Sequence, residues 1–279
     1  MTEVPAPTPG GPDSVVLIHG LWMSRLSWQP WVDRFSAAGW TVHTPEWPGM
    51  DRPIEEIRSD PSPMNDVGVG EVVESHAEFI KGLPSKPIIM GHSFGGLITE
   101  LLLDRLLGAA GVALSPAPGK GIYLLPRRAL KSAFPVLKSP GNRKKTVALT
   151  PAQFHDAFAN TLSEAESKDV YDRLHVPAPG RPLFQAAFAN MAPKSPLAFN
   201  RKRPGRAPLL LVGASEDHLV PAVVTSKAFH LYKHAPSTTE LKVFDGRSHF
   251  LCGEPGWEEI ADYSLDWANN AAQPAAPTA

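Results

Sequence analysis

The chain has 279 residues, of which 43% are hydrophobic and 20% charged, and its formal net charge is -1. This composition is typical of a globular protein and excludes a disordered or fibrous chain. The near-neutral total gives no indication that nucleic acid is a partner.

The two ends of the chain differ from the rest. Residues 1–12 and 271–279 are rich in proline and small residues and show no periodicity, so we expect both to be disordered tails. Between them, short apolar runs alternate with amphipathic helical patterns, which is typical of βαβ units. We therefore predict an α/β fold with a mostly parallel, doubly wound sheet, whose core is formed by residues 13–118 and 207–270.

The expected elements of the core follow from the spacing of apolar residues in chain order. Before residue 118 the sequence predicts strands at 14–19, 40–47, 87–90 and 111–114, separated by helical patterns at 28–35, 69–80 and 97–106. After residue 207 it predicts strands at 209–212 and 241–244, a helix opened by Pro221 between them, and a closing helix that begins at Trp257. No repeat with a period of 20 to 50 residues is visible, which argues against solenoids and propellers.

Residues 119–206 break this alternation. They are dense in proline and hold 16 Lys and Arg against five Asp and Glu, whereas the rest of the chain has 11 against 23. We interpret this segment as an inserted, largely helical cap, or lid. Its basic clusters either steer anionic substrates, dock on an acidic surface or form an ordinary solvated face.

The segment Gly91-His92-Ser93-Phe94-Gly95 fits the pattern G-x-S-x-G between a predicted strand and a predicted helix. In that setting the serine occupies a strained turn and projects its hydroxyl above the sheet, while the two glycines leave room for neighbouring atoms. Ser93 is therefore the candidate nucleophile. A glycine-rich turn without catalysis is the alternative.

A serine hydroxyl needs a base to take its proton. His249 lies in a loop after the last predicted strand and is the candidate base. Asp217 follows the strand at 209–212 and is the expected acid that orients the histidine. Glu216, one residue earlier, is an alternative acid, and Asp217 could instead cap the helix opened by Pro221.

The chain order Ser93, Asp217, His249 resembles the α/β-hydrolase superfamily and differs from the orders of the chymotrypsin and subtilisin families. The resemblance covers residues 14–118 and 207–270. It implies a serine hydrolase with an oxyanion hole formed by the backbone N–H groups of Phe94, after the nucleophile, and Leu21, within the His-Gly-x pattern at 19–21.

Three short segments, at 16–20, 53–57 and 217–221, are similar to a branch that contains small-ester esterases and hydroxynitrile lyases. The lyases need Lys directly after the catalytic histidine, and here Phe250 stands in that place, which disfavours cyanohydrin cleavage. We assign Trp22 and His92, which adjoin Leu21 and Ser93, to substrate binding.

The sequence thus predicts cleavage of a carboxylic ester, or of a thioester or lactone, through an acyl-enzyme on Ser93. Carbon–carbon bond hydrolysis, acyl transfer and cofactor-free perhydrolysis on the same triad are alternatives, as is a non-catalytic ligand receptor with this fold. We expect a small-molecule ester as substrate, no cofactor, no metal and no nucleic acid, and nothing indicates an oligomeric state.

The expected compartment is the cytoplasm. Cys252 is the single cysteine, so an intrachain disulfide is impossible and a reducing environment fits the chain. Residues 1–12 lack the basic start and apolar run of a secretory signal. No apolar stretch reaches the roughly 18 residues that span a bilayer, so we expect no stable membrane insertion.

Overall fold

A computed structural model describes residues 4–123 and 126–273 and contains one main sheet of six strands. Every neighbouring pair in this sheet is parallel, and the strand order is β2-β1-β3-β4-β7-β8. The strands are β1 (Ser14–Ile18), β2 (Thr41–His43), β3 (Ile88–His92), β4 (Ala110–Leu114), β7 (Leu209–Ala214) and β8 (Thr239–Phe244). The four central strands are buried along their whole length. Their nearly continuous apolar sequences are those of strands covered on both faces.

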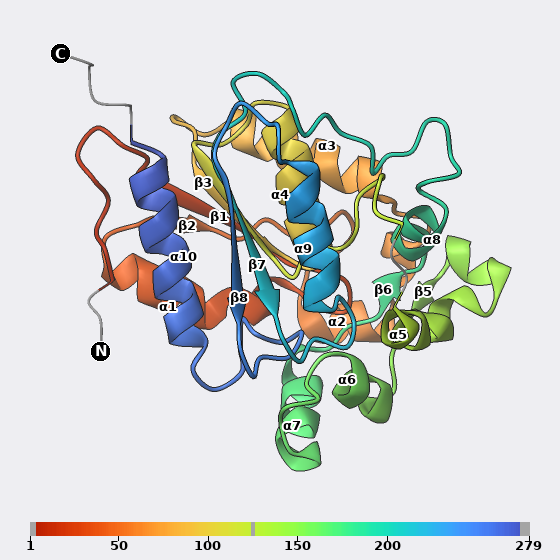
Figure 1. The fold of residues 1–279 in the computed structure, drawn as a ribbon. Helices are drawn as coiled ribbons and strands as arrows, with labels where there is room; N and C mark the ends of the chain where they lie inside the picture. Colours follow the sequence, from red (N-terminus) through yellow and green to blue (C-terminus); the bar gives the residue numbers. More distant parts are fainter. Residues whose placement is uncertain (1–3, 124–125, 274–279) are drawn as a thin grey trace.

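Helices cover both faces of the sheet (Figure 1). One face carries α1 (Gln29–Ala37), which follows the 3₁₀ turn η1 (Arg25–Trp28), and α10 (Trp257–Ala271). The other face carries α3 (Val69–Lys81), α4 (Phe94–Asp104) and α9 (Ala222–Leu231). The expected doubly wound α/β architecture is confirmed.

The strand order of the sheet reverses direction between β1 and β3. From β1, the chain moves outward to β2 over one face and later returns beside β1 as β3, from which it continues in the opposite direction. Ligands of open α/β sheets bind outside the carboxyl ends of the strands at such a reversal point. The turns after β1 and β3 therefore lie where a functional site is expected.

Between β4 and β7 the chain leaves the sheet, and this excursion contains the cap segment, residues 119–206. Its helices are α5 (Arg127–Leu137), α6 (Pro151–Ala157), α7 (Glu164–Leu174) and α8 (Arg181–Ala187), with the 3₁₀ turn η3 (Pro140–Lys144) after α5. The strands β5 (Thr146–Val147) and β6 (Ala178–Pro179) pair in an antiparallel ribbon. α2 (Ile54–Ser59) and η2 (Ser62–Met64) complete the described elements. None of the helices in the described part of the chain is long and apolar enough to cross a bilayer.

Two local expectations were wrong. Residues 4–12 were expected to be disordered, but the Trp40 indole donates to the Pro5 carbonyl at 2.8 Å and the Asn269 amide donates to the Ala6 carbonyl at 3.2 Å. The remainder of that tail, and most of the one expected at 271–279, lies outside the described residues. The strand expected at 40–47 pairs only over Thr41–His43, because Pro45 interrupts the run and a proline has no N–H to donate to a ladder.

Candidate active site

The four turns that carry the expected site residues follow four strands of the main sheet. Leu21 follows β1, Ser93 follows β3, Asp217 follows β7 and His249 follows β8. Because all of these strands are parallel, the turns meet at the same edge, on the side of the reversal point.

Ser93 sits in a sharp turn between β3 and α4. Its backbone angles are φ 57° and ψ -119°, and φ is in the positive region that residues other than glycine adopt rarely and at an energetic cost. The turn also presses the start of α4 against β1, since a Cβ at Gly95 would lie 2.0 Å from the Ile18 carbonyl oxygen. The strain and the close approach are those of a nucleophile elbow.

His249 and Asp217 form a hydrogen-bonded pair whose side chains are fully buried. The distance from His249 Nδ1 to Asp217 Oδ2 is 2.7 Å. The other carboxylate oxygen accepts the backbone N–H groups of Leu219 and Val220 at 2.8 and 2.7 Å. Burial raises the pKa of Asp217, but the charge and hydrogen bond of His249 together with the Val220 N–H outweigh it, and the pKa is lowered overall. Asp217 is therefore a carboxylate, and Glu216 is exposed to solvent.

The pair leaves one ring nitrogen of His249 available. Nε2 is buried and has no hydrogen-bond partner among the described residues, Ser93 included. The His92 and His249 rings are 4.6 Å apart between centroids, which places the base beside the residue that precedes Ser93. Hydrogen bonds between a nucleophile and its base are often formed only when substrate binds.

The two residues expected to donate to an oxyanion, Leu21 and Phe94, follow β1 and β3 at this edge. Phe94 is the first residue of α4, so its N–H has no partner within the helix, and no acceptor for the Leu21 N–H occurs among the described residues. Gly20 allows the two turns to approach, because a Cβ there would lie 2.8 Å from Ser93 Cβ. An N–H pair beside a serine can receive the charge of an oxyanion.

Trp22 and His92, both assigned to substrate binding from the sequence, have different surroundings. Trp22 lines a cavity next to Ser93, and its indole donates to the Val147 carbonyl at 3.0 Å. His92 is not among the residues that line this cavity; its Nε2–H donates to the His249 carbonyl at 2.7 Å. Burial and the neighbouring His249 lower the pKa of His92 to about 3, so it is a neutral group that holds the His249 backbone. Its geometry supports a positioning role in place of the expected substrate contact.

The cavity at Ser93 has a volume of 140 Å³ and is walled by apolar side chains. Its cap side consists of residues of α5 and α8, and its core side consists of Trp22, Ser93, Phe94, Ala117, Pro118, Leu219 and Val220. The cap contributes Ala129, Leu130, Ala133, Leu137, Leu183, Ala186 and Ala187. Ser93 is one of the residues that line this apolar space, and none of the lining residues carries a charge.

Two acidic residues near the site were missed in the sequence. Glu254 is buried, and its carboxylate accepts the backbone N–H of Ser248 at 3.0 Å and both the Ser248 and Thr161 hydroxyls, at 2.7 and 2.6 Å. Nothing in the local sequence distinguishes it from a surface acid. Glu46 lies 3.0 Å from His19 Nε2, and a charge within the apolar run 40–47 was a signal that could have identified it.

Part of the cap segment contacts the loops of the acid and the base. The Phe158 ring meets the His249 ring edge-on at 4.9 Å between centroids, and the Phe158 carbonyl accepts the Phe250 N–H at 2.8 Å. The Asn160 amide donates to the Glu216 carbonyl at 3.0 Å. With Thr161 on Glu254, these bonds join the cap to the loops on both sides of the His249–Asp217 pair.

A parallel sheet with a strained serine after its third strand, and a buried histidine–aspartate pair beside it, defines the class of α/β proteins that carry a nucleophile elbow. Residues 15–262 match the model of the alpha/beta hydrolase family, and the chain belongs to that family. No curated protein sequence matches the chain. No group of three or more His, Cys, Asp or Glu side chains that could hold a metal occurs among the described residues.

Solved structures with the same fold cover nearly the whole chain. A monoacylglycerol lipase from Paleococcus ferrophilus is 21% identical, with a TM-score of 0.64 over 94% of this chain and 96% of that one. An extracellular α/β-hydrolase from a Paenibacillus species is 22% identical, with a TM-score of 0.64 over 91% and 98%. A tomato methylketone synthase I variant is 17% identical, with a TM-score of 0.66 over 93% and 98%. At these identities the likeness establishes the fold.

Proposed function

We propose that the protein hydrolyses a carboxylic ester through an acyl-enzyme on Ser93. The observation that carries the proposal is the buried His249–Asp217 pair, bonded at 2.7 Å, with the second ring nitrogen of His249 unpaired beside a serine at φ 57°. A base oriented by a carboxylate and a serine in a strained turn are the two requirements of nucleophilic acyl transfer.

In the proposed reaction, His249 Nε2 takes the Ser93 proton as Oγ bonds to the ester carbonyl carbon. Negative charge moves to the carbonyl oxygen, where the N–H groups of Leu21 and Phe94 receive it. The carbon–oxygen bond to the alcohol then breaks as His249 returns the proton to the leaving oxygen. Water, activated by the same nitrogen, attacks the acyl-enzyme, and the carboxylic acid leaves as Ser93 regains its proton. Asp217 stabilises the His249 imidazolium in both halves of the reaction, acylation and deacylation.

The cavity at Ser93 limits the size and the charge of the substrate group that can enter it. A cavity of about 150 Å³ lined by apolar side chains holds a molecule of the size of benzene, and the cavity at Ser93 measures 140 Å³. The part of the ester that enters it is therefore uncharged and of about six non-hydrogen atoms. We propose a short aliphatic or single-ring group for this part, in preference to a long fatty chain.

The test combines turnover with covalent labelling. The purified protein should hydrolyse p-nitrophenyl acetate and butyrate and lose this activity when a fluorophosphonate probe modifies it. Mass spectrometry of the digested protein should locate one phosphonate on Ser93. The matched control is Ser27→Ala, which removes another buried serine, distant in sequence from the triad. An absence of both turnover and labelling would contradict the proposal and favour a ligand receptor with a hydrolase fold.

A further inference from the structure

The first helix of the cap segment, α5, has an exposed face that combines positive charge with apolar side chains. Positions 127, 130, 131, 134 and 138 follow each other at helical spacing, so their side chains form one stripe along the helix. The last of them is the C-cap residue, whose backbone is still helical. All five side chains are exposed. We call this stripe the α5 face, and it consists of Arg127, Leu130, Lys131, Phe134 and Lys138.

The α5 face lies in a part of the chain that carries one sign of charge. Residues 105–155 contain nine Lys and Arg and no Asp or Glu. Lys131 pairs with Asp156 of α6 at 2.9 Å. Arg127 and Lys138 have no acidic partner within the part of the chain that the structure describes. Two cations of the α5 face are thus available to an anionic partner.

Two apolar side chains lie between these cations. Phe134 is 62% exposed and Leu130 is 46% exposed. They are four residues apart, which makes them neighbours on the helix surface, and Phe134 is also four residues from Lys138. Apolar side chains that gather on one exposed surface mark a site of contact with a protein or a membrane.

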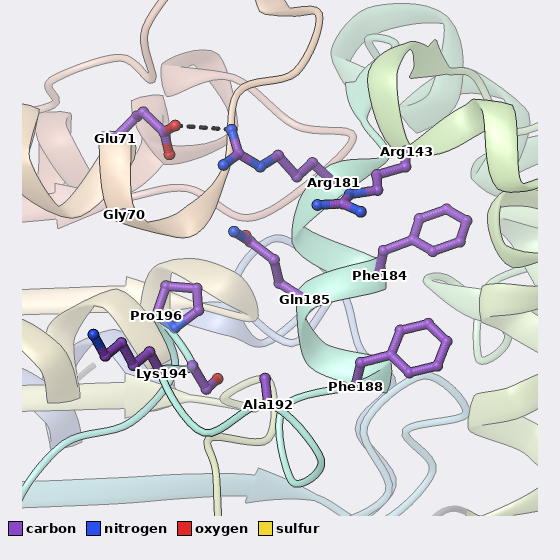
Figure 2. Close-up of a pocket in the computed structure, with 11 residues that line it drawn as sticks. Gly70, Glu71, Arg143, Arg181, Phe184, Gln185, Phe188, Ala192, Lys194 and Pro196 are labelled. Carbon is purple, nitrogen blue, oxygen red and sulfur yellow. Dashed lines mark hydrogen bonds and ion pairs between the residues drawn. The ribbon is translucent and has the colours of Figure 1, made fainter.

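The opposite side of α5 is supported by the rest of the protein. Ser132 and Val136 are buried, and α5 packs against α8. Figure 2 shows a second cavity, bounded by α8 and α3, in which Arg181 of α8 donates to Glu71 of α3 at 2.8 Å. Gln185 of α8 accepts a backbone N–H at the start of α3 at 2.9 Å. The α5 face therefore rests on a fixed support and loses little freedom when it binds.

The alternation of cations and apolar side chains along one stripe determines which partner fits. The boundary between headgroups and acyl chains of an anionic bilayer offers phosphates and hydrocarbon at adjacent depths. Long Lys and Arg side chains reach the phosphates while neighbouring Phe and Leu side chains enter the hydrocarbon. A purely acidic protein surface would pair with the cations and leave the two apolar side chains in water.

We propose that the α5 face docks the protein on the surface of an anionic lipid bilayer. Arg127 and Lys138 bind lipid phosphates, and Leu130 and Phe134 enter the boundary between headgroups and acyl chains. Because Leu130 also lines the cavity at Ser93, docking places one wall of that cavity against the lipid. The inference does not depend on the reaction proposed for Ser93, since binding can be measured without turnover.

The first test measures co-sedimentation of the full chain with phosphatidylcholine vesicles that contain about one third phosphatidylglycerol or none. We expect binding to the anionic vesicles alone. Arg127→Gln with Lys138→Gln should weaken it about tenfold to thirtyfold, because each cation near such a surface contributes about a factor of five. The matched control is Lys81→Gln with Lys86→Gln, which removes two exposed charges that precede β3, at the opposite edge of the sheet from the cap.

The second test measures entry of the apolar side chains into the bilayer. Phe134→Ala should weaken binding to the anionic vesicles about fivefold or more, whereas Phe79→Ala, at a 37% exposed position of α3, should not. A fluorophore attached to Phe134→Cys should shift its emission to the blue on these vesicles, and one on Phe79→Cys should not. Cys252 does not compete for the label, because it is buried and burial raises the pKa of its thiol to about 12.

Two outcomes would overturn the proposal. One is equal binding to anionic vesicles by the two double charge variants. The other is a loss of binding in Arg127→Gln with Lys138→Gln without any effect of Phe134→Ala and without a blue shift at position 134. That second result would assign the α5 face to an acidic protein surface. Unchanged melting temperatures of the variants serve as the control for folding.

Discussion

The catalytic edge of the sheet and the wall formed by α5 and α8 meet at one cavity, but they are built in different ways. Ser93, Asp217 and His249 are each at most 4% exposed and stand in turns fixed by the sheet or by hydrogen bonds. The wall is apolar and partly exposed, with Leu130 46% exposed. On the proposed function, the core determines the chemistry and the wall determines which substrate reaches it, so substitutions in the two regions should separate rate from selectivity.

The largest effect is expected for Ser93→Ala, which removes the nucleophile and should lower kcat by about a millionfold. The measurement is steady-state hydrolysis of p-nitrophenyl butyrate, with circular dichroism and melting temperature as controls for folding. Near-normal activity in the folded variant would contradict a role for Ser93.

Asp217→Asn should lower kcat by about 10⁴-fold, because an amide in this place favours the wrong imidazole tautomer of His249. Glu216→Gln is the matched control one residue away, and its exposed side chain should be replaceable within about twofold. If Glu216→Gln proved the more harmful change, the acid would be misassigned.

Substitution of Glu254 tests whether its hydrogen bonds hold the loop of His249 in position. Glu254→Ala removes the acceptor of the Ser248 and Thr161 hydroxyls, so the loop of His249 should shift and kcat should fall about tenfold to a hundredfold. KM should change little, because the wall of the cavity is untouched. A rise in KM with kcat unchanged would assign Glu254 to substrate binding.

The wall should alter selectivity with a smaller loss of rate. Ala133→Leu narrows the cavity and should lower kcat/KM for p-nitrophenyl hexanoate relative to the acetate by about tenfold or more. Ala152→Leu, on the exposed side of α6, is the control and should leave the ratio unchanged. An equal fall in kcat/KM for both esters would mean that α5 supports the triad and does not select among substrates.

A further effect concerns pH and stability, and it spans both regions. Burial lowers the pKa of His76 in the core and of His175 in the cap segment to about 4. An unfolded histidine binds a proton below about pH 6.5, whereas these two stay neutral in the folded protein. The free energy of unfolding should therefore fall between about pH 6.5 and pH 4, by up to about 1.4 kcal/mol per pH unit for each histidine.

Urea unfolding at pH 7, 6 and 5 measures this slope. His76→Leu should remove the contribution of His76 to the pH dependence of the free energy of unfolding, while the contribution of His175 remains. A slope that is the same in wild type and variant would show that His76 is protonated in the folded state.

The core could be predicted because its signals are local. Apolar runs and helical spacing located β1, β3, β4, β7 and β8 to within one or two residues at most ends. The G-x-S-x-G pattern could be interpreted as a nucleophile elbow because a strand precedes Ser93 and a helix follows it. Asp217 and His249 are 32 residues apart in the sequence, but their pairing could still be predicted. Each residue follows a strand of the same parallel sheet.

What could not be predicted depends on contacts between distant segments. The bond from His92 to the His249 carbonyl joins residues 157 positions apart, and the bond from Thr161 to Glu254 joins residues 93 positions apart. No periodicity encodes such contacts. The different surroundings of the two faces of α8 could not be predicted for another reason. Apolar residues occur on both faces, so the sequence pattern does not show that one face lines the cavity at Ser93 and the other lines a second cavity with basic residues.

The contacts of residues 156–161 bear on how this protein could be re-engineered by exchanging modules with other hydrolases. The Asp156 carbonyl pairs with the His218 ring at 2.9 Å, and Asn160 and Thr161 bond to the loops of the acid and the base. A graft that exchanged the whole cap would therefore remove supports of the triad together with the old specificity. A graft confined to α5 and α8 would keep these supports and transfer the wall, provided that it retains Arg128 and Lys131 of α5, which contact His218 and Asp156. The useful crossover points therefore lie inside the cap, not at its ends.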